Sequence, residues 1–487
     1  MSNKILINGV DPEECRIAKV KNNKLEEFHI ETAARKITQG NIYKAVITRV
    51  EPSLQAVFVD YGAERHGFLQ KQEIHSDYFQ DTQSGDFSLK KIVKRGQELL
   101  IQVTKDPIMK KGAMITTFIS LPGRYLVLMP GSKNKGVSRK IEDENERKRL
   151  KDIIAKLKVP EGFGLIVRTA GENCTKTLMS KDLSYLMRLW KNINKESVKE
   201  KAPVLLYKEQ NLAVRAIRDY FTLDVTEILI DDPTIYQKVK DFIYLISPKL
   251  PKIVKRYKGA KPIFTKHQLE QQIASIFDSR VNLKSGGCIV IDQTEALVAI
   301  DVNSGKATQK NSIEKTALQT NLEAAEEVAR QLRLRDLGGL IVIDFIDMRE
   351  SKNRSQVEKA LKAHLKEDKA RSKVGRISRF GLLEMSRQRI RPSIEYSSFV
   401  TCKHCHGKGI TPSKETLGLG FLRKLSLEML KDEISGIKGI IPHDVADYLL
   451  NKKRKELLDL EARHGITVSL ERDADMIPGE SKIICEK

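Results

Sequence analysis

The sequence predicts an α/β protein built from several domains. Its 487 residues are too many for one hydrophobic core, so about three or four domains are expected at ordinary domain sizes. One region of short alternating strands is typical of a small β-barrel, and a later pair of apolar strands flanks a single long helix. These patterns predict a barrel and a parallel βαβ unit within one chain.

The first two segments of the chain are rich in strands. Residues 1–35 hold two short alternating strands, too few for a domain, so we expect them to pair with strands from later in the chain. Residues 36–122 contain several short strands separated by basic turns, which predicts a small barrel of the OB type. The expected barrel strands are 41–50, 56–61, 99–105 and 113–118.

The rest of the chain mixes helices with strands. Residues 123–203 combine strands with two helices, and residues 204–280 alternate strand and helix. In residues 281–400 a long amphipathic helix separates two apolar strands, which predicts a βαβ unit whose strands are parallel and buried. Residues 412–487 have the pattern of a small α/β appendage.

The charge of the chain favours a polyanionic partner. It has 86 Lys and Arg residues against 64 Asp and Glu residues, a formal net charge of +22. Such a surplus is typical of proteins that bind nucleic acid or an anionic membrane, although a basic cytosolic protein without such a partner is the alternative. No apolar run reaches the roughly 18 residues that cross a bilayer, and the N-terminus lacks a signal-peptide pattern, so we expect a cytoplasmic protein without a membrane span.

Two aspartates are the strongest candidates for catalysis. Asp301 and Asp344 each lie in one of the two apolar strands of the βαβ unit. A carboxylate among buried aliphatic side chains is costly unless a cation or hydrogen bonds compensate it. We therefore predict a Mg²⁺ site with both carboxylates as ligands, and with Asn303 orienting the scissile phosphate or a water. The alternative is a pair of strand-end aspartates satisfied by loop amides.

A carboxylate metal site in such a basic chain indicates an enzyme that cuts phosphodiesters. The stretch 349–391, which follows the second aspartate strand, has 14 Lys and Arg residues and five acidic ones, a net charge of +9. It could neutralise phosphates near the metal, or it could simply be a solvated helix face. Its best candidates for phosphate contacts are Arg371, Arg376 and Arg379, while Asp347 is a weaker metal-ligand candidate.

The barrel and the segment after it offer further candidate contacts for nucleic acid. Phe58, Tyr61 and Phe68 could stack on unpaired bases, or they could belong to the barrel core. Lys111 could contact a phosphate. Arg168 and the neighbouring Thr169 end a predicted strand and fit a phosphomonoester pocket, although a surface arginine and a turn threonine give the same pattern.

Cys402 and Cys405 have the spacing of metal ligands. Structural zinc takes four ligands, and no second Cys-x-x-Cys pair follows in this chain. His404 and His406 could complete the set, or a second copy of the chain could supply the other half and make zinc the link of a homodimer. Two free thiols in a turn are the remaining alternative.

Taken together, these motifs resemble the catalytic region of the bacterial ribonuclease E/G family. The similarity runs through nearly the whole chain, and its most specific stretches are 56–68, 164–171, 299–304, 331–348 and 378–389.

The resemblance implies a particular order of domains. An RNase H-like domain would be split by an OB-fold RNA-binding domain and a 5′ sensor, and a DNase I-like catalytic domain, a zinc link and a small C-terminal domain would follow. The implied bounds are 1–35 with 204–278 for the RNase H-like domain, 36–122 for the OB fold, 123–203 for the sensor, 279–400 for the DNase I-like domain, 401–411 for the zinc link and 412–487 for the small domain.

The resemblance also implies an activity and its residues. Members of this family are Mg²⁺-dependent endoribonucleases that cut single-stranded A/U-rich RNA, are stimulated by a 5′-monophosphate, and act in mRNA decay and in rRNA and tRNA processing. Asp301 and Asp344 match the Mg²⁺ ligands, and Asn303 matches their helper. The residues matching the 5′-phosphate pocket or its approach are Arg168, Thr169, Gly123, Val127, Arg139 and Arg371, and those matching the barrel contacts are Phe58, Phe68 and Lys111.

The family pattern implies that Cys402 and Cys405 share one Zn²⁺ between two chains, and that pairs of such dimers form a tetramer. Whether His404 or His406 contributes to the zinc site stays open. The chain stops at Lys487, so the scaffold tail on which the RNA degradosome assembles is not expected, and degradosome partners stay open. Two rivals also stay open: a non-catalytic RNA-binding protein on the same fold, and a nuclease acting on DNA.

Overall fold

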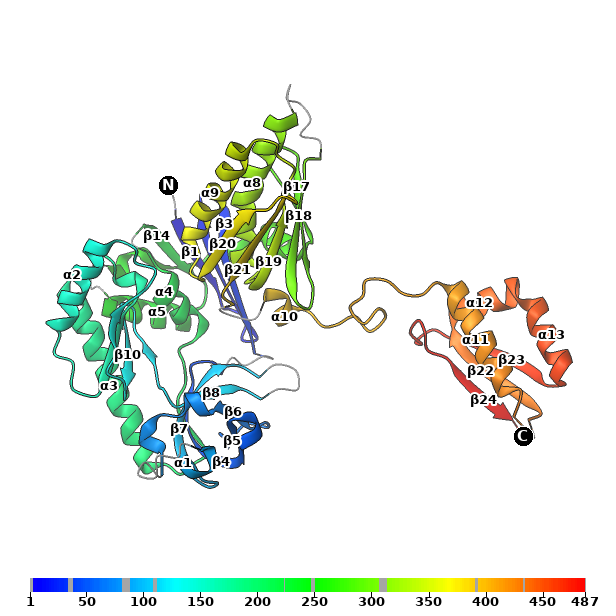
Figure 1. The fold of residues 1–487 in the computed structure, drawn as a ribbon, viewed down its shortest axis with the longest axis horizontal. Helices are drawn as coiled ribbons and strands as arrows, with labels where there is room; N and C mark the ends of the chain where they lie inside the picture. Colours follow the sequence, from blue (N-terminus) through cyan, green and yellow to red (C-terminus); the bar gives the residue numbers. More distant parts are fainter. Residues whose placement is uncertain are drawn as a thin grey trace. The chain divides into compact units, whose positions relative to one another are not determined.

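A computed structural model describes residues 3–33, 38–80, 88–107, 112–222, 224–246, 250–305, 313–389, 393–431 and 434–486. The chain forms two compact units, Met1–Ser397 and Ser398–Lys487, each with its own core (Figure 1). None of the described helices combines the length and the apolar character needed to cross a bilayer.

The N-terminal strands pair with strands from much later in the chain, as expected. They form a five-stranded sheet in the order β15-β14-β1-β2-β3, in which β1 runs parallel to β14 and antiparallel to β2. Apolar clusters cover both faces, one contributed by α4 and α5 and the other by α6 and α7. The elements are β1 Asn3–Asn8, β2 Glu14–Lys21, β3 Lys24–Thr32, β14 Val225–Ile230, β15 Val254–Arg256, α4 Leu212–Tyr220, α5 Pro233–Ile246, α6 Ile263–Lys266 and α7 Glu270–Ala274.

A closed barrel follows in sequence, as the pattern of short strands predicts. Its strands are ordered β4-β5-β6-β8-β7, and β7 pairs back onto β4 to close the ring. Strand β13 pairs antiparallel with the first residues of β4. The elements are β4 Ile42–Glu51, β5 Ala56–Asp60, β6 Gly67–Gln70, α1 Leu89–Ile92, β7 Glu98–Lys105, β8 Met114–Thr116 and β13 Val204–Tyr207.

A small four-stranded sheet lies next along the chain, in the order β11-β12-β10-β9. Helices α2 and α3 pack their apolar sides against it in one shared core. The elements are β9 Leu121–Pro122, β10 Leu126–Pro130, β11 Lys135–Val137, α2 Glu144–Ala155, β12 Phe163–Val167, the short 3-10 helix η4 Thr169–Gly171 and α3 Lys176–Lys199.

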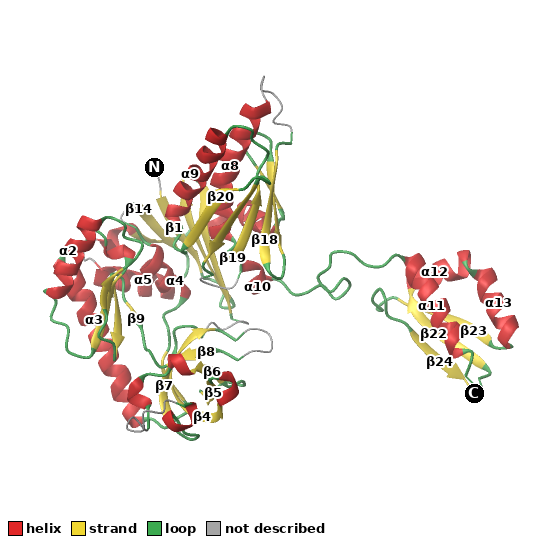
Figure 2. Ribbon diagram, in the orientation of Figure 1, coloured by secondary structure: helices red, strands yellow, loops and turns green. Residues whose placement is uncertain are grey.

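The predicted βαβ unit is the centre of a six-stranded sheet, ordered β16-β17-β18-β19-β21-β20. Strands β18 and β19 are parallel, and the long helix α8 connects them. Helices α8 and α9 pack on one face of this sheet (Figures 1 and 2). The elements are β16 Arg280–Asn282, β17 Cys288–Gln293, β18 Leu297–Asn303, α8 Ile313–Leu334, β19 Gly339–Asp344, α9 Ser351–His364, β20 Ser372–Ile377, β21 Leu382–Arg387 and α10 Ile394–Ser398.

The expectation that both faces of β18 and β19 are buried is wrong. Side chains alternate along a strand, so Val298, Ile300 and Val302 point into the helix-covered core while their neighbours point the other way. On that second face Leu340 is 61% exposed, and both candidate aspartates are exposed. The carboxylates therefore emerge from an open sheet face and are not surrounded by aliphatic side chains.

The C-terminal unit is a small α/β domain, as predicted. Its three strands are ordered β23-β22-β24, with β22 parallel to β23 and antiparallel to β24. Helices α11, α12 and α13 contribute to a core with these strands. The elements are α11 Lys414–Glu428, β22 Gly436–Pro442, α12 His443–Lys452, α13 Arg454–His464, β23 Thr467–Asp473 and β24 Lys482–Glu486.

Candidate functional site

The two candidate aspartates stand directly beside each other. In the parallel pairing of β18 and β19, Asp301 is the register partner of Asp344. Paired residues on neighbouring strands lie about 5 Å apart and project to the same face, so both carboxylates leave the sheet together. Asn303, two residues further along β18, joins them on this face, and its Nδ2 donates to Asp301 Oδ2 at 2.6 Å. The structure thus brings together all three residues that the sequence indicates.

A tight turn between β20 and β21 approaches the carboxylates. Gly381, at φ +81°, is so close that a methyl group in place of its hydrogen would lie 3.2 Å from Asp347 Oδ1 and 3.9 Å from Asp344 Oδ1. Asp347 is a weaker candidate from its place in the sequence, but the fold places it near the same glycine as Asp344. Its position three residues after Asp344 is the only sequence signal for this.

The donor set fits a hard cation that keeps part of its water shell. Carboxylate oxygens are ligands that Mg²⁺ accepts, and Mg²⁺ commonly takes only one or two of them from the protein. In the described parts of the chain, no group of three or more His, Cys, Asp or Glu side chains is arranged to hold a metal by itself. Because Asp301 and Asp344 are exposed, water can fill the remaining coordination positions.

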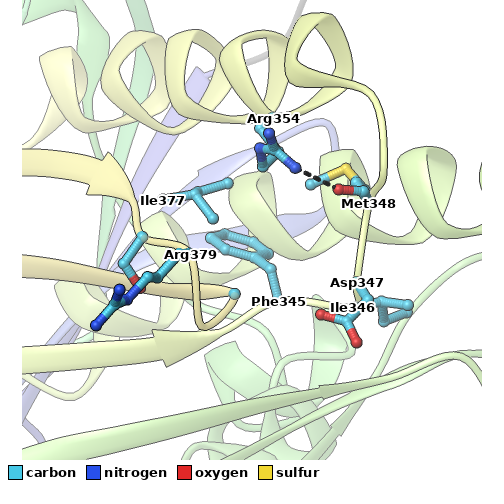
Figure 3. A pocket seen from close by; sticks show the side chains of 9 residues that line it. Phe345, Ile346, Asp347, Met348, Arg354, Ile377 and Arg379 are labelled. Atoms are coloured by element: carbon cyan, nitrogen blue, oxygen red, sulfur yellow. Dashed lines mark hydrogen bonds between the residues drawn. The ribbon is translucent and has the colours of Figure 1, made fainter.

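A cavity of about 430 Å³ opens next to this site (Figure 3). The Phe345 ring lies at the centre of the view, with Arg354 and Met348 above it and Arg379 and Asp347 on either side. Arg354 Nη1 donates to the Met348 carbonyl oxygen at 2.7 Å, which fixes one guanidinium at the rim. The cavity therefore combines an apolar floor with two cations and a carboxylate beside the aspartate pair.

Several residues predicted for the 5′-phosphate site lie around Arg168. Its Nη1 donates to the Gly123 carbonyl oxygen and its Nη2 to Asp219 Oδ1, both at 2.6 Å. Thr169 follows at the start of η4, and its Oγ1 lies 3.2 Å from Ser138 Oγ. Three predicted residues, Arg168, Thr169 and Gly123, therefore lie together.

Asp219 is a member of this cluster that the sequence does not reveal. Burial alone would raise its pKa, but the charges of Arg218 and Arg168 outweigh burial and hold the pKa below its usual range. Asp219 is ionised at neutral pH and fixes one side of the Arg168 guanidinium. Its sequence separation of 51 residues from Arg168 leaves no local signal for the pairing.

The other residues predicted for the 5′-phosphate site or its approach are Val127, Arg139 and Arg371. Val127 pairs with Ile166 on the half-exposed face of the small sheet, the face on which Arg168 follows. Arg139 and Arg371 are both exposed. They flank a contact between two segments, in which Lys140 Nζ donates to the carbonyl oxygens of Asp368 at 2.7 Å and Ala370 at 3.2 Å.

The barrel presents two aromatic rings on its outer side. Phe58 and Phe68 are register partners on β5 and β6, their ring centroids lie 5.8 Å apart, and both are half-buried. The Arg49 guanidinium lies 4.5 Å from the centroid of the Phe58 ring. Tyr61, by contrast, is only 4% exposed and belongs to the barrel core. Lys111 lies outside the described residues.

The cysteine pair forms a turn in the C-terminal unit. Hydrogen bonds from the backbone N–H groups of Gly409 and Gly407 lower the pKa of the Cys405 thiol, which favours the thiolate that a metal requires. Cys402 is exposed, as are the flanking His404 and His406. Structural zinc takes four ligands, so the two thiols would supply half of such a site. Within the described residues no cluster of three or more potential ligands forms here.

Comparison with known protein families places these sites in context. Residues 120–390 match the Ribonuclease E/G family, residues 36–106 match the S1 RNA binding domain, and residues 401–486 match the thioredoxin-like domain of RNase E/G. The S1 match covers barrel strands β4 to β7 and agrees with the OB-type fold predicted for the barrel.

Individual relatives cover most of this chain. It is 48% identical to ribonuclease E of Haemophilus influenzae over 468 residues, which are 96% of this chain and 50% of that protein. It is 47% identical to ribonuclease E of Escherichia coli K12, over 94% of this chain and 44% of that protein. Against ribonuclease G of Escherichia coli K12 the identity is 38%, over 87% of this chain and 88% of that protein. The chain thus spans about half the length of these ribonucleases E and most of the length of ribonuclease G.

Proposed function

The chain belongs to the ribonuclease E/G family, and from this premise we propose that it is an endoribonuclease that hydrolyses single-stranded, A/U-rich RNA with Mg²⁺. The observation that carries the proposal is the register pairing of Asp301 with Asp344 on an open sheet face. The match of the barrel to an S1 RNA binding domain supports RNA as the substrate over DNA. Intact Asp301, Asn303 and Asp344 favour an enzyme over a non-catalytic RNA-binding protein.

Each residue of the site would have its own role. Asp301 and Asp344 would hold Mg²⁺, which when bound supplies Lewis acidity and lowers the pKa of a coordinated water. Asn303 restrains the Asp301 carboxylate through its 2.6 Å hydrogen bond and faces the same solvent as the pair. Arg354 and Arg379 at the rim of the adjoining cavity would offset phosphate charge.

We propose further that Arg168 and Thr169 bind a 5′-monophosphate that stimulates cleavage. A guanidinium carries five N–H donors, and in the described structure Gly123 and Asp219 occupy two of them, so donors remain for phosphate oxygens. Thr169 is exposed beside it and adds a hydroxyl. Arg139, Arg371 and Val127 would border the path of the RNA toward this pocket.

The assembly and the cellular role are also proposals. The paired thiols support one Zn²⁺ shared by Cys402 and Cys405 of two chains, and a tetramer built from such dimers. The two-sided five-stranded sheet and the one-sided six-stranded sheet support the RNase H-like and DNase I-like assignments of the family pattern. The role would lie in cytoplasmic mRNA decay and in rRNA and tRNA processing.

A cleavage assay tests the activity and the sensor together. A short unstructured A/U-rich RNA, labelled at its 3′ end, would carry either a 5′-monophosphate or a 5′-hydroxyl and be incubated with the protein in Mg²⁺. We expect faster cutting of the monophosphate, with the advantage lost in Arg168→Ala. Equal cutting would remove the sensor and keep the nuclease. No cutting of either RNA would favour the non-catalytic RNA-binding protein, and preferred cutting of a DNA competitor would favour the DNA nuclease.

A further inference from the structure

The turn that approaches the carboxylates carries an exposed aromatic ring. Phe380 lies between Arg379 and Gly381 and is 70% exposed, one of the most exposed large apolar side chains in the described structure. A single exposed apolar side chain is ordinary on a protein surface. The position of Phe380 is what sets it apart, because the adjoining Gly381 lies close to the carboxylates of Asp344 and Asp347.

The turn holds Phe380 in place from both sides. Ser378 N–H donates to the Leu382 carbonyl oxygen at 2.8 Å, and the Phe380 N–H donates to Ser378 Oγ at 3.2 Å. Gly381 closes the turn at φ +81°, a conformation that suits glycine. Because Leu382 pairs with Asp344 across β21 and β19, this closed turn is anchored directly to the catalytic strand.

Arg379 covers part of the ring. Its guanidinium lies 4.8 Å from the centroid of the Phe380 ring, an arrangement in which a cation contacts an aromatic face. Ser378, Arg379 and Gly381 line the cavity beside the carboxylates, whereas Phe380 is not part of that lining. The ring therefore stands at the edge of the site and keeps exposed surface for a second planar group.

We propose that Phe380, backed by Arg379, is a stacking platform for the nucleobase of a nucleotide that flanks the scissile phosphate. The inference rests on the proposed function and adds a substrate contact to the carboxylate site. Every nucleobase has an aromatic face, so stacking on Phe380 would fix the strand with little sequence preference. The Arg379 cation would meanwhile lie within reach of the backbone phosphates that accompany the base.

A set of substitutions separates stacking from other roles. Phe380→Ala and Phe380→Leu both remove the aromatic face, whereas Phe380→Trp keeps it. We expect the first two to lower kcat/KM for a single-stranded RNA about tenfold and Phe380→Trp to retain it, since stacking on an aromatic side chain is typically worth that much. Leu340→Ala is the matched control, because Leu340 is 61% exposed at the opposite end of β19. Wild-type activity in Phe380→Leu would overturn the proposal.

RNAs with a single abasic nucleotide, moved step by step past the cleavage position, identify the stacked base. At one flanking position the missing base should slow the wild-type enzyme about tenfold and should not slow Phe380→Ala any further. If the loss of rate from the missing base and the loss from Phe380→Ala multiply at every position, the proposal is overturned. A changed assembly mass in Phe380→Ala that Phe380→Leu restores would also overturn it, because the ring would then contact another protein copy.

The same variants and RNAs show whether the stacking proposal or the proposed nuclease activity is wrong. If the wild-type protein cuts RNA but Phe380→Ala cuts every RNA equally well, the platform is wrong and the nuclease stands. If the wild-type protein cuts no RNA, the nuclease is wrong, and equilibrium binding of the intact and abasic RNAs in metal-free buffer decides the platform. Weaker binding of intact RNA by Phe380→Ala would support it, and equal binding would overturn it.

Discussion

Arg168 and Asp219 form an ion pair that connects two parts of the fold, with 2.6 Å between Nη2 and Oδ1. Arg168 follows β12 of the small sheet, and Asp219 lies near the end of α4, which packs on the five-stranded sheet. The carbonyl oxygen of Asp219 also accepts a hydrogen bond from Lys369 Nζ, two residues before Arg371. The proposed phosphate pocket is therefore held by residues from three separate segments of the chain.

Substitution Asp219→Asn should weaken the preference for 5′-monophosphorylated RNA. The amide keeps the shape of the side chain but removes the charge that orients the Arg168 guanidinium, and a hydrogen bond between charged groups is worth about 1.5–3 kcal/mol. We expect the ratio of kcat/KM for monophosphate over hydroxyl substrates to fall about fivefold, while cutting of the hydroxyl substrate is unchanged. Asp152→Asn, at an exposed carboxylate on α2, is the control, and an unchanged ratio in Asp219→Asn would show that Arg168 needs no such partner.

Removal of either carboxylate of the pair should stop cleavage without loss of RNA affinity. Asp301→Asn and Asp344→Asn keep side-chain volume but lose the charge that would bind Mg²⁺, so we expect rates to fall at least about a hundredfold. The dissociation constant for RNA in metal-free buffer should stay the same, because phosphate contacts dominate affinity. Asp292→Asn on the neighbouring strand β17 is the control. Retained cleavage in Asp301→Asn would contradict the assignment.

The pH dependence of stability should expose a second ionic cluster, around Glu27. Burial alone would raise the pKa of Glu27, but His29 and the charges of Lys369 and Lys19 lower it from 4.5 to about 2. A lowered carboxyl pKa stabilises the fold fully above the unfolded value and loses that effect as pH falls toward the folded value. We therefore expect stability to decline between about pH 5 and pH 2, with a contribution from Glu27 on the order of 3 kcal/mol.

Thermal melts at stepped pH values test this expectation. Glu27→Gln should reduce the fall in melting temperature below about pH 5, and it should lower stability at neutral pH. Glu144→Gln, on the first turn of α2, should leave the fall in melting temperature at acid pH unchanged. A fall that is equally steep in Glu27→Gln would assign the decline to other carboxylates.

The periodicity of the sequence was sufficient to predict the central strands of the sheet that carries Asp301 and Asp344. Two apolar strands around one helix predict a parallel βαβ unit, and that unit places Asp301 and Asp344 side by side in the structure. The exposure of that face could not be predicted, because an aliphatic run such as 340–343 looks the same whether helices cover one face or two. The 61% exposed Leu340 shows that the cover is one-sided here.

Contacts between residues from distant segments could not be predicted from the sequence. Asp219 beside Arg168, and the turn at Gly381 beside Asp344, depend on how separate segments pack, and no local spacing encodes such contacts. In the barrel, the sequence likewise does not show which aromatic side chains are buried. Phe58, Tyr61 and Phe68 are equivalent as sequence candidates, but strand alternation and the end of β5 put Tyr61 in the core and leave the two phenylalanines on the outer side.

Substitution of the outer barrel aromatics should weaken RNA binding. Phe58→Ala and Phe68→Ala each remove a ring that can stack on an unpaired base, so each should cost about 1–3 kcal/mol of affinity for single-stranded RNA. Fluorescence anisotropy with a labelled oligonucleotide measures this loss. Tyr61→Phe is the control, since its buried ring packs against Tyr43 with centroids 5.1 Å apart and should not contact RNA. Unchanged affinity in both alanine variants would restrict the two rings to a structural role.

The cysteine turn gives the last prediction, on assembly. If Cys402 and Cys405 of two chains share one Zn²⁺, the double substitution Cys402→Ser with Cys405→Ser should abolish bound zinc and halve the mass measured by light scattering. A chelator should do the same to the wild-type protein, because zinc supplies the link itself. Cys485→Ser, at a half-buried thiol on β24, is the control and should retain both zinc and mass.

His404→Ala and His406→Ala should also retain zinc, because four thiolates from two chains already complete a tetrahedral site. Loss of zinc in either histidine variant would mean that the histidines complete the site within one chain, and an unchanged mass in the double cysteine variant would show that the turn does not join two chains.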